Sequence, residues 1–318
     1  MIINKNKFSL KKAFSLIELS IVILIIGILV AGVTQSSRLV SRMKQISVRS
    51  LTLNSPISSI KDLYAWYETS LDSSFDEAEA SDGSALTNWY DLNPQIASAK
   101  VNFNQTNLAS KPLYKNSSIN GLSAVYFDGN DFMNTDINNP SVLGSQSATF
   151  FFVFKPTNAL QQGFLITQSY ITCGNNIEIG HTTGNQGSGN FGIHSGCNRA
   201  TVTPGNIIVN NSPIIVSMVL LSTPLTNGST SNVKIFKNGG SELALTADGG
   251  GYNSGLNGAY AVGNYNLYLG VRFDHRSSLN AYYSGFIGEI IIFSRALSAE
   301  DRKEIEKNLG KKWGIAVQ

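Results

Sequence analysis

The sequence predicts a mainly β protein, in which a long N-terminal membrane-crossing helix precedes an antiparallel β-sandwich and a short C-terminal helix. Residues 14–33 form an apolar run of twenty residues with one charge. From residue 60 onward, short apolar or alternating runs are separated by Gly, Asn and Ser clusters, as in an all-β domain. Near the C-terminus, one apolar stripe follows a good helix N-cap.

Composition and charge limit the classes of function. Of 318 residues, 42% are hydrophobic and only 14% are charged, against roughly 25% charged in average soluble proteins. This argues against a nucleic-acid binder and against a charged disordered chain. Residues 1–50 hold eight Lys or Arg and one acid, whereas the remainder holds sixteen bases and twenty acids. The basic excess therefore belongs to the N-terminus.

The N-terminal segment reads as a membrane signal. Residues 1–13 are polar and carry four lysines, and the apolar run 14–33 would form a helix of ~30 Å, long enough to cross a bilayer. The lysines would keep the N-terminus on the cytoplasmic side. The run is too long for an ordinary secretory signal, and no A-x-A cleavage site follows it. A simple one-span anchor is the plain alternative.

Glu18 argues against a plain anchor, because a carboxylate within an apolar span is costly unless it has a partner or a function. The surrounding residues, KKAFSLIELSIVILIIGILVAG, resemble the class III signal of type IV prepilins and pseudopilins. The resemblance implies that prepilin peptidase cleaves between Ala13 and Phe14 and methylates the new amino terminus of Phe14. It also implies that Glu18 neutralises the amino terminus of a neighbouring pilin subunit. Ala13 stands where the family usually has Gly, and the leader is longer than in most type IVa pilins.

The helix should continue beyond the membrane. Leu39, Met43, Ile46 and Leu53 recur at helical spacing, and Pro56 is a plausible stop. We therefore predict a leader at 1–13, a pilin-type helix at 14–55 with the transmembrane part at 14–33, and a β domain at 60–318.

The β domain is predicted from β-branched and aromatic runs of strand length. Turn residues such as NGG at 238–240 and GGG at 249–251 punctuate them. No helical period separates the runs, which argues against βαβ units and favours a jelly roll. The clearest runs are 63–68, 124–128, 148–155, 214–221, 232–237, 267–271 and 286–294.

A single C-terminal helix should follow. Ser298 is a good N-cap, and Asp301 three residues later approximates a capping box. Gly310 is placed to end the helix. The apolar stripe consists of Ile305, Leu309 and Trp313.

Two stretches of the domain resemble the laminin G–like, concanavalin A–type jelly roll of bacterial surface proteins. The first comprises LYAWYETS, LTNWYD, KPLY and INGLSAVYFDGND, and the second is GFIGEIIIFSRALSAEDRKEIEKNLGKKWGI. Many such domains bind carbohydrate, and the bacterial β-glucanases cleave it with Glu, Asp and Glu at alternate positions of one strand. Here only Glu289 stands on a comparable strand, and Ile291 and Phe293 are not acids. The sequence therefore predicts that the chain is not an enzyme.

The resemblance also implies that the domain could bind calcium. Asp128 and Asp131 are weak candidates for its ligands, and Asp136 is a third. The competing interpretation is a tight Asp-Gly turn, since hard cations need six or more oxygens. No cofactor is expected otherwise. The histidines are expected in exposed loops: His181, His194 and His275. Five tyrosines lie among Gly and Asn and fit either sugar stacking or packing: Tyr252, Tyr260, Tyr265, Tyr282 and Tyr283.

Cys173 and Cys197 are the two cysteines of the chain. The predicted topology places both outside the cytoplasm, where disulfides persist. A bond would close a loop of about 25 residues and stabilise the fold by about 3 kcal/mol in the chain-entropy model. Two unrelated buried thiols are the alternative.

Together these features predict a type IV pilin-like subunit in the bacterial inner membrane. It would be single-pass with its β domain outside the cytoplasm, and would pass into a pilus, pseudopilus or the cell surface. The expected partners are prepilin peptidase, other pilin subunits and a surface glycan or protein, with no nucleic acid. A domain this large favours a minor subunit. The alternatives are a type II secretion pseudopilin and a tethered lectin that does not polymerise.

Overall fold

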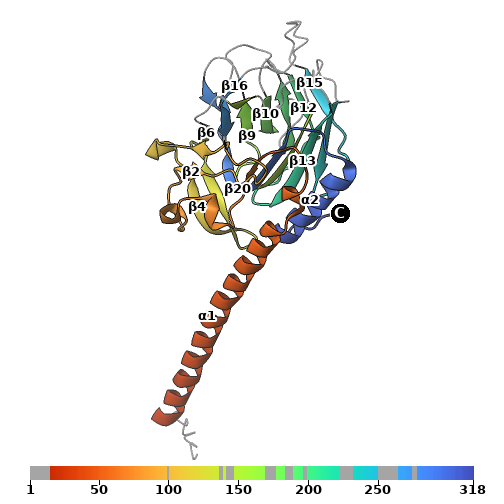
Figure 1. The fold of residues 1–318 in the computed structure, drawn as a ribbon. Coiled ribbons are helices and arrows are strands. Elements are labelled where there is room, and N and C mark those ends of the chain that lie inside the picture. The colour runs from red at the N-terminus through yellow and green to blue at the C-terminus, as the bar shows by residue number, and fades with distance from the viewer. Residues whose placement is uncertain are drawn as a thin grey trace, which may run out of the picture. The chain divides into compact units, whose positions relative to one another are not determined.

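The computed structural model describes residues 15–318 except 99, 136–138, 141–146, 169–176, 183–188, 196–198, 222–231, 250–263 and 274–277. Contacts divide the chain into two units, Met1–Ser47 and Val48–Gln318. The expected architecture is confirmed: a long N-terminal helix, antiparallel sheets and a short C-terminal helix (Figure 1).

Helix α1 (Leu16–Leu53) begins with the apolar segment. Its residues Leu16–Val33 are long and apolar enough to cross a membrane, and their side chains are exposed. The helix ends three residues before Pro56, as expected from the steric restriction that proline places on the preceding residue. The 3₁₀ turn η1 (Pro56–Ser58) follows, capped by the Ser55 hydroxyl.

The first sheet of the β domain has seven strands. Every strand run predicted above overlaps a strand of the two main sheets, although the run 267–271 extends two residues beyond β17. Its order is β14-β13-β8-β20-β5-β4, and β1 pairs with the second half of β20. All its pairings are antiparallel. The bounds are β14 Val233–Lys237, β13 Ile214–Leu220, β8 Ala148–Pro156, β20 Ser284–Phe293, β5 Leu122–Asp128, β4 Leu113–Ile119 and β1 Leu63–Tyr67.

The second sheet has nine strands in the order β15-β12-β11-β10-β9-β17-β6-β3-β2. Two small ladders, β16 with β7 and β18 with β19, complete the described strands. The bounds in the large sheet are β15 Thr246–Gly249, β12 Arg199–Val202, β11 Asn190–Ser195, β10 Ile177–Thr182, β9 Gly163–Gln168, β17 Leu267–Leu269, β6 Met133–Thr135, β3 Phe103–Asn104 and β2 Asn88–Trp89. The small ladders and remaining 3₁₀ turns are β7 Asn139–Pro140, β16 Asn264–Tyr265, β18 Arg272–Phe273, β19 Leu279–Asn280, η2 Asp72–Ser74, η3 Glu77–Glu79 and η4 Leu108–Ser110.

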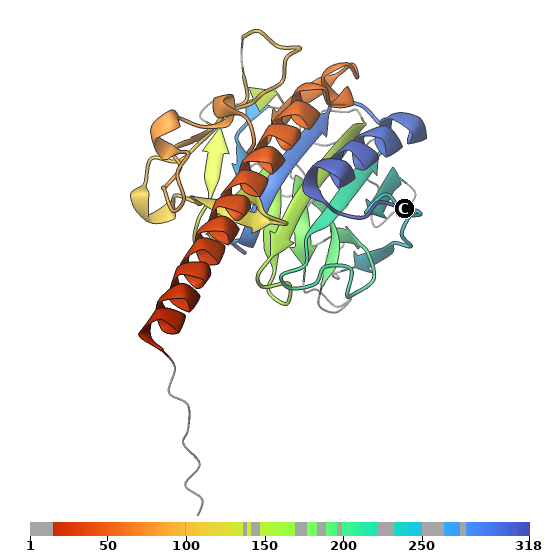
Figure 2. The same ribbon diagram turned by 90° about the horizontal axis from the view of Figure 1, so that it is seen from below.

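The seven-stranded sheet is buried on both faces. In β8, Phe150, Phe152 and Phe154 belong to the core that it shares with residues of the nine-stranded sheet. Phe151 and Val153 belong to a second core with helix α2 (Ala299–Trp313). Burial on both faces explains why β8 reads as a continuous apolar run rather than an alternating one. Figure 2 shows α2 lying across this sheet.

Helix α2 starts and ends on recognisable caps. The Ser298 hydroxyl accepts a hydrogen bond from the Asp301 N–H at 3.1 Å, which confirms the predicted N-cap. The expectation that Gly310 ends the helix is wrong, because α2 continues to Trp313 and Gly314 adopts φ +62°. Gly310 serves close packing instead: a Cβ there would lie 2.4 Å from the side chain of Val317.

Both outer strands of the seven-stranded sheet order are covered by loops of the same chain. On β4, Tyr114 exchanges backbone hydrogen bonds with Gly83 and Ser84, both at 2.8 Å. On β14, the Leu243 N–H donates to the Ile235 carbonyl at 2.9 Å. The exposed row of backbone groups that makes an edge strand adhesive is therefore interrupted by these loops at both strands.

Candidate functional site

The start of α1 is built around the predicted assembly residue. The Glu18 carboxylate accepts a hydrogen bond from the Ser15 N–H at 2.9 Å, and the Ser15 hydroxyl accepts one from the Ile17 N–H at 3.3 Å. Together these bonds form a variant of the capping box, in which the Ser15 hydroxyl accepts from the second rather than the third helical N–H, and they satisfy helix N-terminal donors that lack an intrahelical partner. Glu18 thus has a partner within its own chain. Ala13 and Phe14 lie outside the described residues.

A second candidate site is a row of residues, all polar except Ala200, that crosses the nine-stranded sheet. Directly opposed residues on neighbouring antiparallel strands share one face of a sheet. The pairings link one residue from each strand in register: Asn88, Asn104, Asn134, Tyr268, Thr167, Glu178, His194, Ala200 and Asp248. We call this set the polar row. The alternate residues, such as Phe103, Met133 and Ile179, lie in the core. The polar row therefore occupies the face opposite the core.

The middle of the polar row is buried and charged. Glu178 is fully buried, and the Arg272 Nε lies 2.8 Å from its carboxylate. The His194 ring packs edge-on against Phe164 at 5.3 Å between ring centres. Burial, with a smaller contribution from Arg272, lowers the pKa of His194 to about 3. The histidine is therefore neutral at physiological pH, and the ion pair fixes the arginine beside it.

The other end of the polar row is accessible. Asn88, Asn104, Asn134 and Tyr268 are half-buried. The Tyr268 ring stacks on Phe273, with 4.7 Å between ring centres and 6° between planes. Asn88 and His194 stand on the first and last of seven neighbouring strands. At standard strand spacing the two residues lie roughly 29 Å apart across the sheet. Amide groups beside a flat aromatic pair can hydrogen-bond hydroxyls and contact the apolar face of a ring.

Glu289, the acid singled out on a glucanase-like strand, belongs to a buried ion cluster. The Lys312 Nζ lies 2.9 Å from the carboxylates of both Glu68 and Glu289. The indole N–H groups of Trp66 and Trp313 donate to Glu289 at 2.8 Å and 2.7 Å. Glu68, Glu289 and Lys312 are each at most 2% exposed. The cluster therefore joins α2 to β1 and β20 and has no access to a substrate.

The acids proposed for calcium form the hydrogen bonds of a turn. The Asp131 carboxylate accepts from the Asp128 N–H, and the Asp128 carboxylate accepts from the Asn130 N–H, both at 2.9 Å. Gly129 has φ +105°, as the turn interpretation expects. Burial, with a further contribution from Asp128, raises the pKa of Asp131 to about 7. Within the described ranges, no three His, Cys, Asp or Glu residues gather as a metal site, and Asp136 lies outside them.

The expectation of exposed loop histidines is wrong for His181 and His194. His181 lies on β10, is 1% exposed and packs against Tyr283, and His194 lies on β11. Tyr283 is a core residue and Tyr282 is half-buried. The side chain of Tyr265 is not described. Outside the described residues lie Tyr252, Tyr260, His275, Cys173 and Cys197, including the predicted disulfide.

Comparison with known protein families gives a match at the N-terminus of the chain. Residues 9–34 match the prokaryotic N-terminal methylation motif. The match includes Ala13, Phe14 and Glu18, and it supports a pilin-like, membrane-anchored protein. No curated protein matches the chain in sequence.

Comparison with solved structures concerns the β domain. Domain 4 of the GH43 arabinanase AbnA from Geobacillus stearothermophilus, in complex with arabinotriose, is 14% identical with a TM-score of 0.46, covering 77% of this chain and 98% of that one. A GH54 α-L-arabinofuranosidase is 12% identical with a TM-score of 0.48, covering 72% and 51%. Trypanosoma rangeli sialidase is 10% identical with a TM-score of 0.43, covering 82% and 37%.

Two expectations are corrected by these neighbours. The domain resembles jelly rolls of carbohydrate-binding and glycosidase proteins rather than laminin G specifically. The expectation that the chain is not an enzyme is contradicted, because the matched structures include glycoside hydrolases and sialidases. That expectation rested on the residues of one strand only, Glu289, Ile291 and Phe293 of β20. At these identities and TM-scores the neighbours assign no activity to this chain.

Proposed function

We propose that the chain is a minor type IV pilin-like subunit, processed by prepilin peptidase and displaying its β domain outside the cytoplasm. The methylation motif at 9–34 carries this proposal. The membrane-length segment Leu16–Val33 supports it, because a processed pilin keeps this helix as its anchor. In a filament, Glu18 would exchange its Ser15 partner for, or share it with, the amino terminus of a neighbouring subunit, since a carboxylate can accept several hydrogen bonds.

Mass spectrometry of the mature N-terminus tests the proposal. The chain is expressed in a bacterium with its prepilin peptidase and in a matched strain without it. We expect N-methyl-phenylalanine at Phe14 in the first strain and the intact leader in the second. An intact Met1 in both strains, or cleavage after residue 33, would refute the assignment. Recovery in sheared filaments, compared with recovery in the inner membrane alone, separates a pilus subunit from a tethered protein.

The polar row supports a second function, the binding of a glycan by the displayed domain. Three asparagines provide amide donors and acceptors, and the Tyr268–Phe273 pair provides a flat apolar surface beside them. Sugars present hydroxyls at their edges and C–H groups on their ring faces, so this combination suits them. The length of the row favours several sugar units of an extended chain over a single terminal sugar.

Binding of soluble polysaccharides and their oligosaccharides to the full-length protein in detergent tests this function. We expect affinity to rise with oligosaccharide length and to fall about tenfold in Tyr268→Ala, which removes the stacking surface. Tyr126→Ala is the matched control, because Tyr126 is also half-buried and packs against an aromatic ring, Phe286, at 4.9 Å between ring centres, but on the other sheet. Equal affinity in both variants would exclude the polar row as the binding surface.

A further inference from the structure

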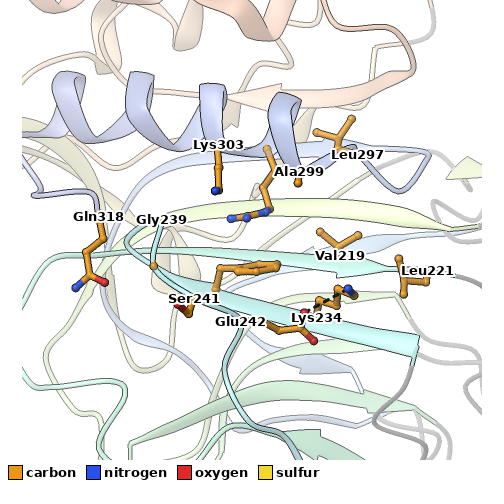
Figure 3. Close-up of a pocket in the computed structure, with 13 residues that line it drawn as sticks. Val219, Leu221, Lys234, Gly239, Ser241, Glu242, Leu297, Ala299, Lys303 and Gln318 are labelled. Carbon is orange, nitrogen blue, oxygen red and sulfur yellow. Dashed lines mark ion pairs between the residues drawn. The ribbon is translucent and has the colours of Figure 1, made fainter.

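A groove lies between helix α2 and the strands β13 and β14. Figure 3 shows its walls, and its volume is about 600 Å³, within the range of ligand-binding clefts. Its apolar lining comes from Val219, Leu221, Phe236, Leu297 and Ala299. Leu221 is 41% exposed. We call this cavity the α2 groove.

Basic side chains dominate the polar lining of the α2 groove. Lys234 stands on β14 and Lys303 on the facing wall in α2 (Figure 3). Lys234 forms an ion pair at 3.3 Å with Glu242, and Glu242 is the single acid of the described lining. Arg302 is nearly buried, its guanidinium lies 3.5 Å from the centre of the Phe236 ring, and its charge is already paired with the Glu306 carboxylate. Lys303 is exposed, so its charge faces whatever enters the groove.

A surface of opposite charge lies elsewhere on the same domain. Residues 62–99 contain eight acids and no base. Five of these acids lie within residues 72–82, which we call the acidic knob: Asp72, Asp76, Glu77, Glu79 and Asp82. Two of them hold the knob in shape. Asp76 accepts from the Tyr90 hydroxyl at 2.8 Å, and Glu79 accepts from the Thr87 N–H at 2.7 Å. Glu77 and Ala78 are exposed between them.

The groove and the knob lie at opposite edges of the seven-stranded sheet. The groove is formed on β13 and β14, whereas the end of the knob leads directly into the loop that pairs with β4. β14 and β4 are the two ends of the strand order, which places them roughly 24 Å apart at standard strand spacing. Knob and groove of one domain therefore cannot meet, but those of two copies can.

We propose that the acidic knob of one copy docks in the α2 groove of the next. Because the two surfaces differ and lie on opposite sides of the domain, the contact is heterologous and generates an open head-to-tail row rather than a closed dimer. Ala78 would face the apolar lining while Glu77 approaches Lys303. Pairing between the β4 and β14 edges of the seven-stranded sheet is a poor alternative, since loops of the chain cover both strands. If the chain is a pilin-like subunit, as proposed above, copies joined this way would adjoin one another in a row.

A charge-swap series in the full-length protein tests the contact. Lys303→Glu and Glu77→Lys should each weaken self-association about tenfold at low salt, and the difference should shrink at high salt. The double variant exchanges the two charges and should recover most of the loss. Lys307→Glu is the matched control, because Lys307 is an exposed lysine of the same helix that does not line the groove. An equal loss in the control, or no recovery in the double variant, would overturn the proposal.

Cross-linking identifies the occupant of the groove. A photoreactive residue at position 78 in one copy is mixed with an isotope-labelled copy without it. Cross-links from position 78 to labelled peptides containing residues 234–242 or 297–303 support head-to-tail docking. Cross-links to other regions of the labelled copy, or none between copies, would refute it. N-terminal processing is read independently by mass spectrometry, so failure of the docking leaves the pilin assignment standing.

Discussion

Replacing Lys312 with methionine should strongly destabilise the β domain. Lys312 lies within 2.9 Å of two carboxylates, and all three side chains are buried. Methionine has a similar length and fills much the same space, so the substitution removes mainly the charge. It leaves Glu68 and Glu289 facing each other without a cation. Breaking a buried ion pair from one side costs about 3–5 kcal/mol in the free energy of unfolding.

The pH dependence of stability gives the reasoning a second test. Burial alone would raise the pKa of Glu68, but Lys312 and hydrogen bonds from Ser70 and Ser74 hold it below its ordinary value. This carboxylate therefore contributes stability above its unfolded pKa, and the contribution is lost as pH falls through the lowered folded pKa. Burial alone would lower the pKa of Lys312, yet the two carboxylates hold it above its ordinary value. The stability that Lys312 contributes is complete below its unfolded pKa and is lost as pH rises through its raised folded pKa.

In Lys312→Met the sign for Glu68 reverses. Without the ammonium group, burial dominates and raises the pKa of this carboxyl. The variant should therefore recover part of its lost stability relative to the wild-type protein as pH falls from 8 to 5. The difference between the two proteins cancels the titration of groups outside the cluster, such as His194 and Asp131. Urea unfolding followed by tryptophan fluorescence measures both, since Trp66 and Trp313 contact the cluster. Lys311→Met, at an exposed position of the same helix, is the control. A loss below about 1 kcal/mol with no pH dependence would show that the cluster is not a stabilising element.

Substitutions at three further positions test other elements. Glu18→Leu removes both the charge and the cap, so this variant should insert readily into the membrane yet fail to enter filaments. Glu18→Gln keeps an acceptor for the cap. The presence of the Glu18→Gln variant in sheared filaments would show that the charge is dispensable. Gly288→Ala should destabilise the β domain by about 1–3 kcal/mol in urea unfolding, because the new Cβ would lie 2.5 Å from the Trp313 ring. An unchanged midpoint would mean that the ring can move aside. Ser298→Ala should cost about 1 kcal/mol through loss of the N-cap, and a loss below 0.3 kcal/mol would contradict the assigned cap.

The elements that could be predicted from the sequence are those in which successive residues have the same surroundings. The strands of the seven-stranded sheet are long and apolar, since both faces are buried, and β8, β13 and β20 were therefore readable. The helix end near Leu53 was readable from Pro56. Short strands such as β2 and β3, with two residues each, give no periodic signal. Their pairing depends on contacts distant in sequence.

The candidate site was only partly predictable for the same reason. Glu18 was found because a charge within an apolar run is conspicuous and its neighbours form a specific motif. The polar row was missed, because its members come from nine separate strands and single asparagines carry no local signal. Glu289 was noticed on its strand, but its partner Lys312 comes from α2, and no local pattern links the two. The fate of Gly310 likewise depended on Val317, seven residues later.

The loops that cover β4 and β14 have a consequence for proteins that are concentrated side by side. Subunits of a filament experience a very high local concentration, at which open sheet edges would exchange strands and become irreversibly joined. In this domain the edge hydrogen bonds are already made by residues 83–86 and 242–243. At these two edges, neighbouring copies can therefore touch only through side chains. Contacts of that kind separate again without any strand having to unfold, which would allow a filament carrying this domain to be dismantled and its subunits returned intact to the membrane.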